Sequence, residues 1–229
     1  MNTEVYNSRI SIQVSLSGYS FKTEEGGKAF SSGWLGAEKI FTSPELQKRY
    51  DLVEISLMTE KCALVPASFF VPEDARTALA EVVDLRDTDQ VEYVGVPAFG
   101  AVLVYSLSVD ESLSRLVSTT VLDTDGRQSR VLPEMYYILR DILSCTDYNK
   151  IMASYRDGHL HLAIAQGKSL LLANVFPAQD FTTAQYFIFL AMKKLQLNPE
   201  VSTISFRTPL SPEDEMSLYR YFKAVEICG

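Results

Sequence analysis

The clearest alternation of apolar and polar positions lies between Ser154 and Ser169. The turn pairs Asp157-Gly158 and Gln166-Gly167 interrupt apolar runs there, and such pairs join adjacent antiparallel strands. The pattern predicts a three-stranded meander over residues 151–155, 159–165 and 169–175.

The N-terminal segment has a similar pattern. Arg9–Leu16 alternates with a period of two, which predicts a strand with one buried face. Ser17-Gly18 predicts a turn, Tyr19–Lys22 the return strand, and residues 28–32 a third strand. Gly33–Gly36, which contains the single tryptophan, has the composition of a loop.

Capping boxes and helical spacing predict the helices. Thr42–Glu45 forms such a box, and Leu46, Tyr50, Val53 and Leu57 continue it as an apolar stripe. Thr182–Gln185 predicts an N-cap for a helix that is apolar on nearly all sides and therefore mostly buried. Further helices are expected to begin at Pro72, Ser108, Pro133 and Ser211, and further strands at residues 62–66, 91–94, 101–105, 118–122 and 203–206.

Many of these signals recur 140 positions apart. Gly18 matches Gly158, Leu64 matches Ile204, and Pro72–Asp74 matches Pro212–Asp214. Thr42 and Thr182 place one capping box on the other. Each match is common alone, and coincidence is the competing explanation. Together they predict one β-β-β-α-β-α unit used twice, with halves at residues 1–120 and 121–229, the second including the linking helix.

This order of elements is that of the ribonuclease H-like core, and two cores in tandem form the actin-like arrangement. Arg9–Phe21 resembles the opening of an uncharacterised bacterial family grouped with the actin-like ATPases. Leu172–Phe176 and Leu195–Glu200 resemble its second half. The resemblance implies an α/β fold with a ligand cleft between the halves and the first turn of each half facing phosphate.

The same resemblance implies where a nucleotide would bind. The class places an aspartate and a glycine at the first turn of each half, where they hold magnesium-bound water and approach phosphate. This sequence keeps Asp157 and Gly158 in the second half, but Leu16-Ser17-Gly18 in the first has no carboxylate. The class also has glycines before its last helix, and Thr208–Pro212 has none. Gly18, Asp157 and Gly158 are therefore cofactor-binding candidates only if a nucleotide binds.

Three other motifs fail on spacing. Gln166–Ser169 is not a P-loop, because Leu162 occupies the position of the required glycine. Asp123–Gly126 is not a calcium loop, because its first and twelfth positions are apolar. His159 and His161 point the same way on a strand, but no third metal ligand is close to them in sequence. The three cysteines are widely spaced and predict neither a disulfide framework nor a zinc site.

Composition excludes several partners. The net charge is −8 and the pI is about 4.9, which argues against nucleic acid or an anionic membrane. The longest apolar runs, Ala98–Leu107 and Tyr186–Met192, are too short to span a bilayer. Met1–Val5 does not begin a signal peptide, so a cytoplasmic location is expected.

The sequence favours a non-catalytic actin-like interaction or scaffold protein with degenerate nucleotide-binding loops, no cofactor, no metal and another protein as its partner. The alternative is a nucleotide-binding ATPase or kinase-like enzyme that uses ATP and magnesium in the cleft between the halves. A hydrolase whose catalytic residues cannot be paired from the sequence is a third possibility. No GxSxG nucleophile motif occurs.

Overall fold

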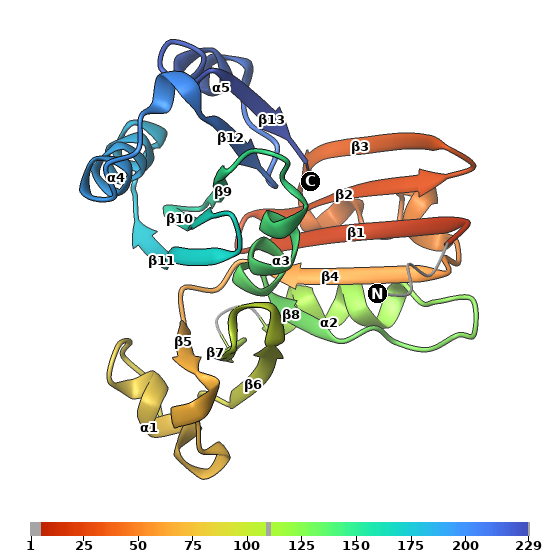
Figure 1. The fold of residues 1–229 in the computed structure, drawn as a ribbon. Helices are drawn as coiled ribbons and strands as arrows, with labels where there is room; N and C mark the ends of the chain where they lie inside the picture. The colour runs from red at the N-terminus through yellow and green to blue at the C-terminus, as the bar shows by residue number, and fades with distance from the viewer. Residues whose placement is uncertain (1–5, 109–110, 229) are drawn as a thin grey trace. The chain divides into compact units, whose positions relative to one another are not determined.

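The computed structural model describes residues 6–108 and 111–228 (Figure 1). Its contacts divide the chain into two compact units. Unit 1 comprises Met1–Met58, Asp110–Leu132 and Gly229, and unit 2 comprises Thr59–Val109 and Pro133–Cys228. Met1–Val5, which bear on the expected absence of a signal peptide, lie outside the described residues, as do Val109 and Asp110 of the capping box expected at Ser108.

Unit 1 is built on a five-stranded sheet of order β3-β2-β1-β4-β8. Central strand β1 pairs antiparallel with β2 and parallel with β4, so that Ile12 lies between Phe21 and Ile55. The strands are β1 (Ser8–Ser15), β2 (Gly18–Glu25), β3 (Lys28–Leu35), β4 (Leu52–Leu57) and β8 (Val131–Pro133). Helix α2 (Glu111–Thr120) contacts β4, and its Val117 is fully buried.

The prediction of a helix after Thr42 is wrong. Pro44–Gln47 forms one short 3-10 turn, η2, and the chain then enters strand β4. All but the first residue of β4 are buried, although Val53–Leu57 alternates apolar and polar residues at a period of two. A strand buried on both faces can imitate a helical stripe in sequence. The other 3-10 turn before β4 is η1 (Ala37–Lys39).

Two smaller expectations in unit 1 are also wrong. Strand β3 continues to Leu35 and includes Trp34, which had been expected in a loop. Residues 118–120 belong to α2 and not to a strand.

Unit 2 contains a second five-stranded sheet, of order β11-β10-β9-β12-β13. The predicted meander is confirmed, with the first turn at Asp157-Gly158 as expected and the second at Gly167-Lys168, one residue later than expected. The strands are β9 (Asn149–Arg156), β10 (His159–Gln166), β11 (Ser169–Pro177), β12 (Thr203–Phe206) and β13 (Ala224–Ile227). One face carries the core with helices α4 (Phe181–Lys194) and α5 (Pro212–Leu218), and η7 (Pro199–Val201) precedes β12.

The N-cap of helix α4 lies two residues before the expected N-cap, Thr182. Asp180 is the cap, and its carboxylate accepts a hydrogen bond from the Thr183 amide at 2.7 Å. Ile188 is fully buried, but Tyr186 is 60% exposed, so the helix has one exposed face. The cap predicted at Ser211 is confirmed, because its hydroxyl accepts from the Asp214 amide.

The rest of unit 2 is a three-stranded antiparallel sheet of order β5-β7-β6, with helix α1 packed on it through Leu79 and Val104. Its elements are β5 (Cys62–Pro66), η3 (Ala67–Phe69), η4 (Pro72–Asp74), α1 (Ala75–Ala80), β6 (Val91–Val96), η5 (Pro97–Phe99) and β7 (Ala101–Ser106). Helix α3 (Glu134–Asp141) and η6 (Ile142–Ser144) lead into β9.

The two five-stranded sheets share one strand order, as two tandem ribonuclease H-like halves require. The meanders match one residue beyond the predicted offset of 140, because the hairpin end Ser15–Gly18 corresponds to Arg156–His159. Leu64 and Ile204 are not equivalent. Leu64 pairs antiparallel with β7, whereas Ile204 pairs parallel with β9 in a five-stranded sheet. The parallel neighbour of β1 is instead β4. The division of the sequence at residues 1–120 and 121–229 stays a prediction.

Candidate functional site

A pocket of about 340 Å³ lies at the β9–β10 turn in unit 2. It brings together the turn that carries Asp157 and Gly158 and the loop that precedes α5, two segments that are about 50 residues apart in sequence. Its lining residues are Tyr155, Arg156, Asp157, Gly158, Gln179, Pro209, Leu210, Ser211 and Asp214.

The turn is shaped by two residues with positive φ. Asp157 has φ 48° and Gly158 has φ 78°, the left-handed pair that suits a two-residue hairpin. The Gly158 carbonyl accepts from the Ala178 amide at 2.7 Å, which ties the turn to the end of β11. The Asp157 carboxylate lies 3.5 Å from Nε of Arg156, so the cation and the anion at this turn offset each other.

The opposite wall of the pocket is acidic. Ser211 caps α5, and its hydroxyl donates to Oδ2 of Asp214 at 2.7 Å. Burial raises the pKa of the Tyr155 hydroxyl most, and the carboxylates of Asp180 and Asp214 raise this pKa further. A pocket with this potential favours a cationic group over a phosphate.

Gly18 lies in unit 1, at the first position of β2. The turn itself is Leu16-Ser17, one residue earlier than expected. Gly18 has φ 143°, and a Cβ added to it would overlap the carbonyl oxygen of Leu35 on β3. The glycine is therefore required by the close approach of the β2 and β3 backbones.

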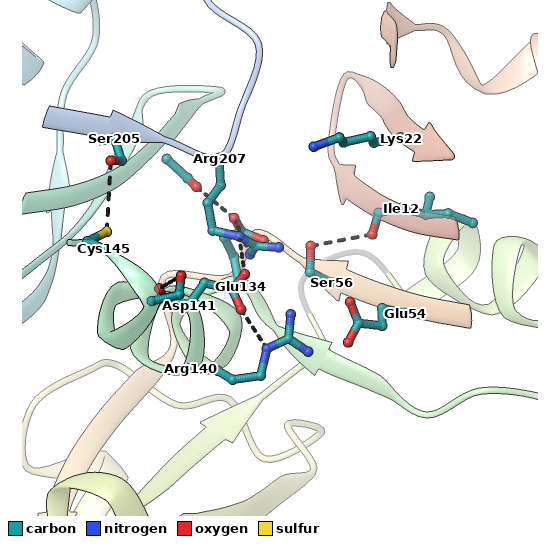
Figure 2. Close-up of polar contacts among 12 residues, drawn as sticks. Ile12, Lys22, Glu54, Ser56, Glu134, Arg140, Asp141, Cys145, Ser205 and Arg207 are labelled. Atoms are coloured by element: carbon teal, nitrogen blue, oxygen red, sulfur yellow. Dashed lines mark hydrogen bonds and ion pairs between the residues drawn. The ribbon is translucent and has the colours of Figure 1, made fainter. Parts of the chain in front are cut away.

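A buried ionic cluster connects the end of β12 to α3 in unit 2. Arg207 Nη1 lies 2.9 Å from Glu134 Oε1, and Arg207 Nε lies 3.1 Å from Asp141 Oδ2. Ser154 on β9 donates to Glu134 at 2.6 Å, and Arg140 pairs with Asp141. Figure 2 shows Arg207 extending toward both carboxylates.

This cluster was not identified from the sequence. Glu134 and Arg207 are 73 positions apart, and each stands at the boundary of an element where charged residues are common. The available sequence signal was Glu134, the acidic residue directly after Pro133, but an acidic residue there is equally typical of an ordinary helix start.

The two histidines of β10 contact consecutive residues. His159 Nε2 lies 2.7 Å from the Glu60 carboxylate, and His161 Nε2 lies 3.0 Å from the Thr59 carbonyl oxygen. Their shared direction is as predicted. Burial lowers the pKa of His161, which keeps its ring neutral. Within residues 6–108 and 111–228, no three histidine, cysteine or acidic side chains are grouped as metal ligands.

Asp123–Gly126 is a turn held by its own side chain. Oδ1 of Asp123 accepts from the Arg127 amide at 2.7 Å, and Asp125 pairs with the exposed Arg127.

In the described part of the chain, no helix has both the length and the apolar composition needed to cross a membrane.

Comparison with solved structures establishes the fold. A Bacteroides thetaiotaomicron protein with an actin-like ATPase fold and unknown function superimposes with a TM-score of 0.66 and 18% identity, over 97% of this chain and 91% of that chain. The PilM-PilN type IV pilus biogenesis complex matches with a TM-score of 0.50 and 12% identity, over 96% of this chain and 88% of that chain. The α/β actin-like fold predicted from the sequence is confirmed.

Sequence comparison agrees with the resemblance noted at the N-terminus. No curated protein matches the chain. Residues 3–225 match the family described as "Protein of unknown function (DUF3822)". The chain therefore belongs to this family, with an actin-like ATPase fold as its architecture.

Proposed function

We propose that this chain is a non-catalytic binding protein on an actin-like fold, acting in the cytoplasm, and that its partner is another protein. The observation that carries the proposal is the close packing of Gly18 against its own sheet. The residue that would approach phosphate in the first half is packed against the Leu35 carbonyl of its own sheet, and its turn has no carboxylate.

The pocket at Asp157 supports the same function. Arg156 is the cation in its lining, and its guanidinium lies beside Asp157. Asp214 adds a second carboxylate on the opposite wall. A triphosphate would bring several negative charges toward two carboxylates, which is unfavourable unless metal ions offset them.

The likeness to the PilM-PilN complex supports a protein partner, because that neighbour is recorded in complex with another protein. The fold can therefore serve in protein assembly. The free cysteines Cys62, Cys145 and Cys228 agree with a reducing compartment such as the cytoplasm.

A nucleotide-binding ATPase or kinase-like enzyme is the second candidate. One observation favours it: Asp157, Gly158 and the loop before α5 line one pocket. In that function Asp157 would hold the magnesium of ATP through water, and Gly158 would face the phosphates.

Thermal unfolding with and without millimolar ATP and magnesium separates the two functions. A ligand at about 100 times its Kd stabilises the folded state by about 2.7 kcal/mol, which a melting curve resolves. The proposed function predicts no shift for the wild type. A shift that Asp157→Ala abolishes and Asp125→Asn retains would establish the nucleotide site instead. Asp125 is a suitable control because its carboxylate is 65% exposed and belongs to unit 1.

A further inference from the structure

Two of the three cysteines, Cys145 and Cys228, lie on one face of the second sheet although they are 83 positions apart in sequence. Strands β12 and β13 run parallel with Ser205 opposite Glu226. The Cys228 amide donates to the Phe206 carbonyl at 2.7 Å, so the ladder continues through Cys228. Because side chains alternate along a strand, Cys228 lies on the same face as Glu226 and Ser205.

Cys145 approaches the same face of the sheet from the segment that precedes β9. It follows η6, and its Sγ lies 3.9 Å from Oγ of Ser205, as Figure 2 shows. Ser205 in turn donates to the Glu226 carboxylate at 3.4 Å. Burial raises the pKa of the Cys145 thiol most, and the neighbouring Cys228 raises this pKa further.

The face is open to small molecules. A pocket of about 250 Å³ is lined by Cys145, Ser205 and Glu226 together with Lys150 and Lys223. Cys228 is exposed, whereas Cys145 is half-buried. An oxidant can therefore reach Cys228 directly and Cys145 through the pocket.

We propose that Cys145 and Cys228 form a reversible intramolecular disulfide when the protein meets a peroxide. Deprotonated Cys228 attacks one peroxide oxygen, and the O–O bond breaks to give a sulfenic acid and one water. The Cys145 sulfur then attacks the sulfenic sulfur, the S–O bond breaks, and a second water leaves. Two thiols lose two electrons and two protons, and hydrogen peroxide is reduced to two waters.

Cys62 provides the matched control. It lies on β5 in the three-stranded sheet, and burial raises the pKa of its thiol to about 12. The other two strands of that sheet, β6 and β7, contain no cysteine, so Cys62 has no neighbouring thiol in its sheet with which to form a disulfide.

The test is mass spectrometry of the full chain after one equivalent of hydrogen peroxide and alkylation of the remaining thiols. Oxidation should lower the mass of the wild type by about 2 Da, and alkylation should then modify one thiol only. Digestion without reduction should yield a peptide that joins Cys145 to Cys228. Cys62→Ser should give the same cross-link, and Cys145→Ser and Cys228→Ser should not. Dithiothreitol should restore three alkylated thiols.

A cross-link between two protein molecules through Cys228, or stable sulfinic acid on Cys228 with Cys145 still alkylated, would overturn the proposal. The melting temperature gives a second measurement. A bond that joins two distant positions restricts the unfolded chain, so the oxidised wild type should melt above the reduced protein. An unchanged or lower melting temperature in Cys62→Ser after oxidation would also count against a native-like disulfide.

Discussion

Arg207 and Glu134 form an ion pair at 2.9 Å in which the side chains are 4% and 0% exposed. A pair this deeply buried, together with the pair between Arg207 and Asp141, holds α3 against the end of β12. The guanidinium also lies 5.2 Å from the centre of the Tyr137 ring.

Replacing Arg207 by leucine should lower the free energy of unfolding by about 3–5 kcal/mol, since the buried Glu134 carboxylate would lose its ion-pair partner. Urea denaturation followed by circular dichroism measures the loss. Arg127→Leu is the control: its pair with Asp125 is exposed, and such pairs contribute at most about 1 kcal/mol. Equal losses in the two variants would show that burial does not decide the strength of these pairs.

Gly18→Ala should destabilise unit 1 by about 3 kcal/mol, combining backbone strain at positive φ with overlap between the new methyl group and the Leu35 carbonyl. Gly26→Ala is the matched variant. Gly26 also has positive φ, at 56°, but a Cβ there meets no atom within 4 Å. Its cost should be about 1 kcal/mol. Urea midpoints of the two variants give the difference, and an unaffected Gly18→Ala protein would contradict the self-packing explanation.

Stability should fall as the solution is acidified because of His161. Burial lowers its pKa in the folded state, so the unfolded chain binds the proton more readily. The contribution is complete above about pH 6.5 and is lost below it, with a slope of up to about 1.4 kcal/mol per pH unit. The groups facing the ring are the Thr59 carbonyl, Glu134, His159 and Glu60. Unfolding free energies between pH 7.5 and 5 measure the slope.

His161→Gln should flatten that profile, because glutamine cannot titrate, whereas His159→Gln should retain the loss from His161. If the wild type and His161→Gln lose stability in parallel, another group is responsible for the acid sensitivity.

Ser211→Ala should cost about 1 kcal/mol by removing the cap of α5. Ser211→Asp should retain most of the stability, since aspartate also accepts a hydrogen bond from a helix amide. Chemical denaturation compares both with the wild type. A stable alanine variant would mean that α5 is held by Leu218 and its other core contacts alone.

Local signals predicted the β9–β11 meander well, because two-residue turns with glycine determine strand pairing over short distances. They failed at residues 46–57. Leu46, Tyr50, Val53 and Leu57 have helical spacing, but Val53–Leu57 also alternates apolar and polar residues, which is typical of a strand. The parallel pairing of β4 with β1, about 40 positions earlier in sequence, keeps this segment extended.

The candidate site was predicted only in part. Asp157 and Gly158 do line a pocket, because a hairpin turn can be located from sequence. The Glu134–Arg207 pair and the shared face of Cys145 and Cys228 depend on parallel strand neighbours, for which no single sequence pattern exists.

The strand order also has a consequence for the order of folding. In each five-stranded sheet, three strands are joined by two-residue turns, whereas β4 and β12 join their central strands only after a long intervening segment. Local pairing is fast, and closing long loops is slow. Each sheet should therefore form its antiparallel half early and acquire its parallel half late. During synthesis on the ribosome, the edge of β1 that pairs with β4 would stay unpaired until β4 is made, and the edge of β9 that pairs with β12 would stay unpaired until β12 is made.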